Sequence, residues 1–147
     1  MLIEKEELCS LIPHGGSMCL LESVLSWNEK EIHCVAISHT DQANPLRNHG
    51  RLASVHLLEY GAQAMAVHGG ILAREAGNRV RPGYLAALRD VMLQKEFIDQ
   101  IKTPLMIHAQ TIMSSDDSFM YEFTITSNEQ LLANARATVI AQKSTIQ

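Results

Sequence analysis

The strongest candidate for chemistry in this sequence is Glu59, which stands among apolar neighbours in SVHLLEYGAQAMAVHGGILARE (residues 54–75). A glutamate is rarely fully buried unless it is paired. Gln63 follows one helical turn later, where its amide can meet the carboxyl group. Burial favours the protonated form of a carboxyl group, so Glu59 could act as a general acid near neutral pH. A structural Glu59, satisfied by a neighbouring arginine or histidine, is the alternative.

Two histidines near this stretch could supply a base. His49 lies in the polar loop before it, next to Gly50, and is either the base or an exposed loop residue. His56 precedes Glu59 by one turn on the same helical face, so it could contact a substrate or pack against a neighbouring residue.

The other histidines give no sign of a shared site. A packing or capping role is expected for His14 and a structural role for His68. No partner is evident in the sequence for His33, His39 and His108. A metal centre needs converging ligands, and no spacing indicates one, so no metal or other cofactor is expected.

Residues 54–75 are expected to form one long helix, because their apolar side chains recur with helical spacing. Ser54 is a plausible N-cap, and Gly77 and Asn78 supply a stop. At 1.5 Å per residue the helix would be roughly 30 Å long. Backbone N–H groups at its start, around Ser54, Val55 and His56, would point outward and could stabilise negative charge on a bound oxygen.

The rest of the chain is predicted to be mostly strand. Residues 4–10 could form one or two helical turns, and residues 131–142 are rich enough in alanine to leave helix as an alternative to strand. The expected strands cover residues 18–27, 31–38, 84–95, 105–114, 119–126 and 131–142. This order predicts a single α+β domain, residues 1–147, in which a curved antiparallel sheet of about five or six strands wraps one central helix.

Composition excludes several classes of protein. The net charge is −4 and no basic stripe is present, so nucleic-acid binding is not expected. No apolar run is long enough to cross a bilayer, and the first residues lack a signal-peptide core, which predicts a soluble, cytoplasmic protein. Cys9, Cys19 and Cys34 are odd in number and lack CxxC spacing, so free thiols are expected.

Three segments, in this order, resemble the hotdog-fold 3-hydroxyacyl-acyl carrier protein dehydratases. LIPHGGSMCLLESVLSW (residues 11–27) resembles the opening of that family, with Pro13, His14, Glu22 and Val24 at its marked positions. LLEYGAQAMAVHG (residues 57–69) resembles its helix, whose most specific element is Glu-x-x-Ala-Gln. GYLAALRDVMLQK (residues 83–95) resembles the strand that follows the helix.

The resemblance implies a hotdog fold and a dimer in which the loop histidine of one subunit faces the helix glutamate of the other. It departs from the family in the loop NPLRNHGRLAS (residues 44–54), which lacks the GHFP motif and its histidine. Ungapped alignment puts Pro45 at that place, and His49 reaches it only if the loop is about four residues shorter. This shortened loop is more similar to divergent dehydratase-like proteins of aryl-polyene clusters.

The resemblance therefore predicts dehydration of 3-hydroxyacyl thioesters, linked to acyl carrier protein, to trans-2-enoyl thioesters in fatty acid or polyketide-type biosynthesis. Glu59 is the expected acid and His49 the expected base. The expected substrate-binding residues are Ser54, Val55, His56 and Gln63. A homo-oligomer, or a heterodimer with a homologous dehydratase, is expected. The alternatives are an acyl thioesterase and a subunit of a heterodimeric dehydratase with a partial site or no catalysis of its own.

Overall fold

A computed structural model of the chain describes residues 2–12, 18–78 and 83–141. The strands in chain order are β1 (Ile3–Glu4), β2 (Ser23–Trp27), β3 (Glu31–Ala36), β4 (Gly83–Leu93), β5 (Leu105–Ser114), β6 (Ser118–Ser127) and β7 (Gln130–Ala141). The helices are α1 (Lys5–Cys9), the 3₁₀ turns η2 (Ser38–Thr40) and η3 (Ser54–His56), and α2 (Leu57–Glu75).

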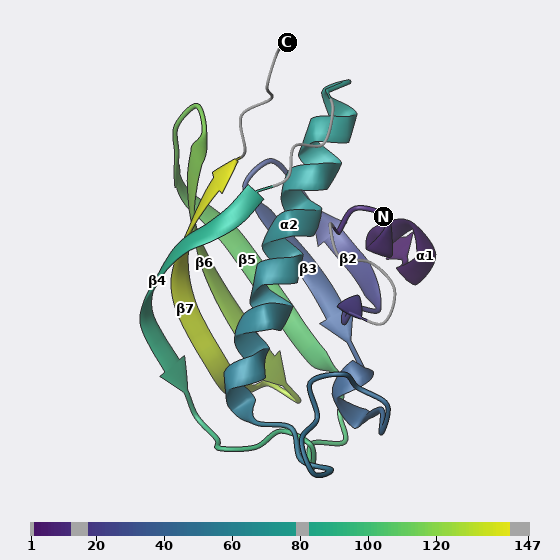
Figure 1. The fold of residues 1–147 in the computed structure, drawn as a ribbon. Coiled ribbons are helices and arrows are strands. Elements are labelled where there is room, and N and C mark those ends of the chain that lie inside the picture. The colour runs from purple at the N-terminus through teal and green to yellow at the C-terminus, as the bar shows by residue number, and fades with distance from the viewer. Residues whose placement is uncertain (1, 13–17, 79–82, 142–147) are drawn as a thin grey trace.

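The strands form one antiparallel sheet in the order β1-β2-β3-β5-β6-β7-β4. The helix α2 lies diagonally across one face of this sheet, as Figure 1 shows. The hotdog fold predicted from the sequence is therefore confirmed. The described residues form seven strands instead of five or six, because the two residues of β1 add a short edge strand that pairs Ile3 with Val24.

The contact between α2 and the sheet depends on a glycine. A Cβ atom at Gly61 would overlap the ring of Phe123 on β6, since non-bonded carbon atoms cannot approach so closely. Both residues are in the core, where Phe123 is fully buried. Glycine at this position therefore lets the helix lie close to the middle of the sheet, with Glu59 two residues away.

The predicted helix is confirmed, but its expected cap is wrong. The chain enters through the 3₁₀ turn η3, and regular α-helix begins at Leu57. The side chain of Ser54 makes no capping hydrogen bond. Its backbone N–H instead donates to the carbonyl oxygen of Glu96 at 2.8 Å, which ties the helix start to the segment after β4.

The first predicted strand begins five residues later than expected, at Ser23. In the preceding residues 18–21, side chains satisfy backbone groups that would pair with a neighbouring strand in a sheet. Gln63 binds the carbonyl of Met18 and the N–H of Leu20, and Lys5 Nζ donates to the carbonyl of Leu21 at 2.7 Å. These contacts come from elements distant in sequence, so the local pattern could not reveal them.

The C-terminal segment is the strand β7, so the helical alternative for residues 131–142 is wrong for the residues that the structure describes. Its backbone pairs on both sides, with β6 and with β4. A segment between two strands gains ladder hydrogen bonds along both edges, which outweighs the helix preference of its alanines.

Two of the three cysteines are paired, which corrects the expectation of free thiols. A disulfide joins Cys9, at the end of α1, to Cys19. Cys34 on β3 is free and buried, and this burial raises the pKa of its thiol to about 12. Disulfides are rare in cytosolic proteins, so this bond gives no support to the expected cytoplasmic location. That location stays a prediction.

No helix within the described part of the chain is both long and apolar enough to span a membrane.

Candidate active site

Glu59 lies in the first turn of α2 and is half-buried. One of its carboxylate oxygens, Oε2, accepts a hydrogen bond from Nε2 of Gln63 at 3.0 Å. No arginine or lysine pairs with this carboxylate among the described residues. The side chain is therefore neither in bulk solvent nor neutralised by a cation, and its second oxygen, Oε1, has no protein partner in the described structure.

The orientation of Gln63 follows from the backbone groups around it. The carbonyl of Met18 can only accept a hydrogen bond, and it lies 2.6 Å from Nε2. The N–H of Leu20 can only donate, and it lies 2.8 Å from Oε1. The amide nitrogen must therefore face Met18, and its other hydrogen points to Glu59. Gln63 is 3% exposed, so it holds Glu59 with little freedom to turn.

The face of α2 that carries Glu59 is lined with small residues. Ala62 and Ala66 are half-buried and Gly69 is exposed, with no atom within 4 Å of a Cβ placed there. These positions follow Glu59 at spacings of three and four residues, so they share one side of the helix. The carboxylate thus lies at the edge of a helix surface that the described residues of this chain leave uncovered.

His49 lies on an exposed two-residue turn before the helix. Asn48 and Arg51 exchange two backbone hydrogen bonds across this turn, at 2.8 and 3.0 Å. His49 and Gly50 have φ of 54° and 75°, the left-handed geometry of a tight type I′ turn. Within the described chain His49 makes no hydrogen bond to Glu59. His49 is exposed at the surface of the chain.

One backbone N–H group at the start of the helix makes no hydrogen bond within the described residues. The N–H groups of Ser54 and His56 are occupied by the carbonyl oxygens of Glu96 and Ala53, at 2.8 and 3.1 Å. The N–H of Val55 has no partner among the described residues, and Val55 is 50% exposed. Of the three predicted donors, this one is free to bind an oxygen.

Comparison with known proteins identifies the family. A model of the ApeP-like proteins, described as ApeP dehydratase, matches residues 6–147. The chain belongs to the ApeP-like dehydratase family. The resemblance to divergent, aryl-polyene-type dehydratases is thereby confirmed. Among curated proteins, none matches the sequence significantly.

Solved structures agree with the family in fold. The dehydratase heterocomplex ApeI:P from Xenorhabdus doucetiae matches with a TM-score of 0.85 and 24% identity, over 93% of this chain and 91% of that chain. A hypothetical thioesterase protein from Streptococcus pneumoniae TIGR4, solved with coenzyme A, matches at 0.61 with 11% identity, over 84% and 87%. The PaaI protein of the E. coli phenylacetic acid degradation operon matches at 0.58 with 14% identity, over 80% of each chain.

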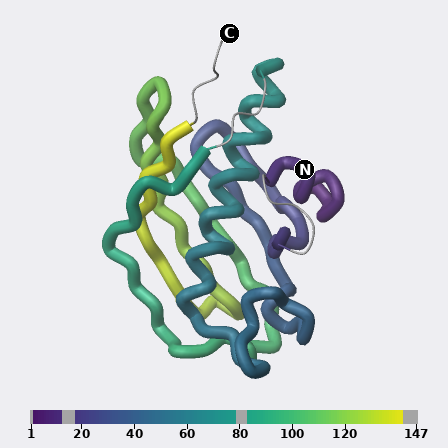
Figure 2. The backbone as a smooth tube through the Cα atoms, in the orientation of Figure 1, coloured from purple at the N-terminus to yellow at the C-terminus, as the bar shows by residue number. Residues whose placement is uncertain are grey.

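In this ApeP-like chain the loop before the helix is anchored by Asp99, which sequence reasoning missed. The Asp99 carboxylate accepts from the N–H of Leu52 at 3.0 Å and pairs with Arg51 Nε at 3.1 Å. The Leu52 hydrogen bond, followed by the Arg51 contacts, lowers the pKa of Asp99. Figure 2 shows residues 94–104 passing beside this loop at the end of the molecule where α2 begins.

A second anchor, also missed, holds the other side of the loop. Tyr60, next to Glu59 but fully buried, shares a hydrogen bond with the hydroxyl of Ser38 at 2.8 Å and accepts one from Asn44 at 3.2 Å. A tyrosine in an apolar helix needs a partner for its hydroxyl group, and that need was the available signal. The partner itself could not be identified from the sequence.

The remaining predicted residues lie outside this site or outside the residues that the structure describes. His14 and Pro13 lie outside the described residues. His68 is buried and bridges the hydroxyl of Tyr121 and the carbonyl of Asn28, at 2.7 and 2.8 Å. Burial lowers the pKa of His68, as expected for a neutral structural histidine.

Proposed function

We propose that this chain dehydrates 3-hydroxyacyl thioesters carried by acyl carrier protein, giving trans-2-enoyl thioesters in fatty acid or polyketide-type biosynthesis. Glu59 is the general acid, and His49 is the general base where the active assembly is a homodimer. The observation that carries the proposal is a half-buried Glu59 carboxylate, held by Gln63, in a member of a dehydratase family. The reaction needs no redox cofactor, because loss of water leaves the overall oxidation state unchanged.

In this mechanism the base removes a proton from C2 while Glu59 gives a proton to the C3 hydroxyl group. The C3–O bond breaks, water leaves, and the C2–C3 double bond forms. Because Oε2 of Glu59 accepts from Gln63, the catalytic proton is carried on Oε1. Gln63 is thus a positioning residue. Proton exchange with solvent returns Glu59 and the base to their starting forms.

Negative charge builds on the thioester oxygen as the C2 proton leaves, and a fixed donor there lowers the barrier. The free N–H of Val55 at the start of η3 is our candidate for this donor. Ser54 and His56 shape the same turn through their own backbone hydrogen bonds. His56, half-buried and one turn before Glu59, would line the substrate's path.

The proposal requires a second subunit, because His49 and Glu59 are not joined within one chain. Two surfaces support such a partner. The first is the small-residue face of α2 that begins at Glu59. The second is β4, which among the described residues pairs only with β7 and exposes large apolar side chains, a combination that favours pairing with another chain. These exposed side chains are Tyr84, Leu85, Val91, Met92 and Leu93.

The partner is either a second copy of this chain or a homologous dehydratase. In a homodimer, His49 of the partner subunit would face Glu59. The similarity to the ApeI:P heterocomplex favours the homologous dehydratase, whose own loop histidine would then serve as base. This assembly accounts for the altered loop of residues 44–54, since one complete histidine loop per heterodimer can be enough.

The test is a product assay with the chain alone and co-expressed with a homologous dehydratase from the same organism. A 3-hydroxyacyl-acyl carrier protein substrate is expected to lose one water, seen by mass spectrometry of the carrier protein. Glu59→Gln in this chain should remove that product in whichever assembly is active. Full activity of the assembly containing the variant would assign this chain a structural role and overturn the proposal.

Thioester hydrolysis is the second candidate, supported by the similar fold of a thioesterase protein solved with coenzyme A. A carboxylate on the same helix could activate water instead of protonating a hydroxyl group. The two reactions differ in their products: hydrolysis releases a free thiol on the carrier, whereas dehydration leaves the thioester intact. Thiol release from wild-type protein without enoyl product would favour hydrolysis.

A further inference from the structure

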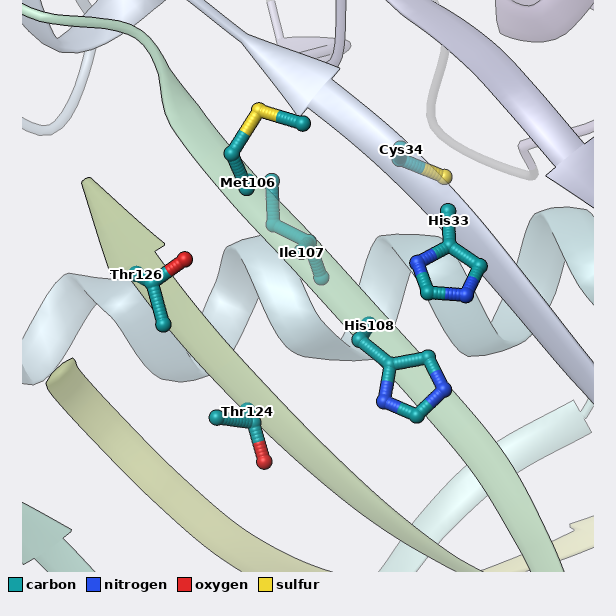
Figure 3. A pocket seen from close by; sticks show the side chains of 7 residues that line it. All are labelled: His33, Cys34, Met106, Ile107, His108, Thr124 and Thr126. Carbon is teal, nitrogen blue, oxygen red and sulfur yellow. The ribbon is translucent and has the colours of Figure 1, made fainter. Parts of the chain in front are cut away.

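The face of the sheet turned away from α2 carries a cluster of histidines that the dehydratase site does not use. Side chains alternate along β3 and β5, so Cys34 and Ile107 are buried toward the helix while His33 and His108 point the other way. Figure 3 shows both imidazoles on this outer face, with the helix behind the sheet.

Strand register brings these two histidines together with a glutamate. His33 and His108 are direct cross-strand partners, and their rings stack with centroids 4.3 Å apart. Glu31 lies two residues before His33, on the same face of β3. Its Oε1 atom is 3.1 Å from Nε2 of His33 and 2.8 Å from Nε2 of His108. Three ligand-type atoms therefore converge on one point.

We propose that Glu31, His33 and His108 form a binding site for a divalent transition-metal ion, with Zn²⁺ as the preferred ion. Two imidazoles and one carboxylate are a common zinc ligand set with a position left open. In a tetrahedral site with bonds of about 2.0 to 2.1 Å, neighbouring ligand atoms lie about 3.3 Å apart. The two nitrogen–oxygen separations are already close to this value, and all three ligand atoms lie within 4.8 Å of one another.

Small adjustments complete the geometry. All three side chains are half-buried, so each can move toward a shared ion without disturbing the core. A zinc ion between the two Nε2 atoms would replace the shared carboxylate contact with three coordinate bonds. Imidazole and carboxylate favour Zn²⁺ over the hard ions Ca²⁺ and Mg²⁺, which take mainly oxygen ligands.

The open coordination position has space beside it. A cavity of about 310 Å³ adjoins the two histidines. Thr124 and Thr126 on β6 and Met106 on β5 line it, and Figure 3 shows their side chains around the hollow. Water or a small anion can therefore complete the coordination. The site ties β3 to β5 on the side of the sheet opposite Glu59, so it is separate from the proposed acid.

The proposed site departs from the expectation that no metal is bound, which the cluster itself does not test. Its ligands come from two strands separated by α2 and β4 in the chain, so no spacing in the sequence marks them. The pairing of β3 with β5 in one register brings them together.

The test is titration of the tag-free, full-length protein with Zn²⁺ by calorimetry, and with Co²⁺ by visible absorption. One equivalent is expected to bind with a Kd of about 1 μM or lower, and a hundredfold excess over Kd should raise Tm by about 5 to 10 °C. Glu31→Gln or His108→Ala should weaken binding by about 100-fold. Co²⁺ should give the intense absorption of tetrahedral coordination with wild-type protein and not with Glu31→Gln or His108→Ala.

Two matched variants control for adventitious binding. His49→Ala removes an exposed imidazole elsewhere, and Glu122→Gln removes a carboxylate on the same outer face; both should keep wild-type affinity. A His33→Ala/His108→Ala double variant that binds Zn²⁺ as tightly as wild type would overturn the proposal. So would wild-type protein that binds no Zn²⁺ at 100 μM. Circular dichroism of each variant confirms that the fold is retained.

Discussion

The two faces of the sheet carry two different kinds of polar cluster. On the helix side, Glu59 and Gln63 are four residues apart on one helix, and the buried Gln63 joins them to the backbone of residues 18–20. On the outer side, Glu31 and His108 come from strands far apart in the chain and meet through register alone. In the first cluster Gln63 is buried and Glu59 is half-buried, whereas all three side chains of the second cluster are half-buried.

The difference shows what each cluster is suited to do. A buried amide that can adopt only one orientation aims one carboxylate oxygen at a substrate, which is the requirement of acid catalysis. Half-exposed imidazoles with an open position beside them can exchange an ion with solvent. Changes on the helix side should therefore alter dehydration, and changes on the outer side should alter metal binding.

The largest effect is expected for Glu59→Gln. The glutamine has nearly the same shape and its carbonyl oxygen can still accept from Gln63, so the fold should be retained. It cannot deliver a proton, so kcat should fall by about 10²- to 10⁴-fold. Initial rates of enoyl formation measure this, with circular dichroism as the check on folding. Retained activity would separate the helix-side cluster from catalysis.

Gln63→Leu should affect both stability and activity. The N–H of Leu20 and the carbonyl of Met18 would lose their partner in the interior, at about 1 to 3 kcal/mol each. The free energy of unfolding should fall by about 2 to 4 kcal/mol in urea denaturation, and kcat should fall by at least about tenfold as Glu59 becomes free to turn. The matched control is Gln110→Leu, an exposed position on the outer face. An equal loss in that control would contradict the role given to Gln63.

The pH dependence of stability tests the burial of Cys34 on the helix side of β3. The pKa of its thiol is raised from 9.0 to about 12 in the folded protein. The unfolded state therefore loses this proton first, and stability that is complete below pH 9 is lost as pH rises from 9 toward 12. At pH 10 the loss is about 1 kcal/mol. Unfolding experiments should show this loss in wild type and not in Cys34→Ala; equal pH dependence in both would contradict it.

The smallest effect on the reaction is expected for His108→Ala. Without added metal, a half-exposed ion pair contributes about 0 to 1 kcal/mol, so unfolding should change little. Dehydration should stay within about twofold of wild type, because the side chain lies on the opposite face from Glu59. A large loss of activity would show that the two faces are coupled, and would contradict the assignment of dehydration to the helix side alone.

Much of the fold was predictable because its signals are local. The helical spacing of residues 54–75 and the alternation along residues 105–114 each follow from neighbours a few positions apart. The strand expected over residues 18–22 does not form, and Lys5 and Gln63 supply hydrogen bonds to Met18, Leu20 and Leu21 from distant elements. The disulfide of Cys9 with Cys19 was missed because three cysteines without a motif define no pairing.

The sequence by itself determined that one carboxylate and one amide share a side of a buried helix, because helical periodicity places side chains four residues apart in contact. It also determined the family, through three short segments in order. Only the tertiary structure decided which way Gln63 faces, how Asp99 and Tyr60 hold the loop, and that Glu31, His33 and His108 meet. These contacts depend on strand register and chain crossings, which bring together residues whose separation in sequence carries no signal.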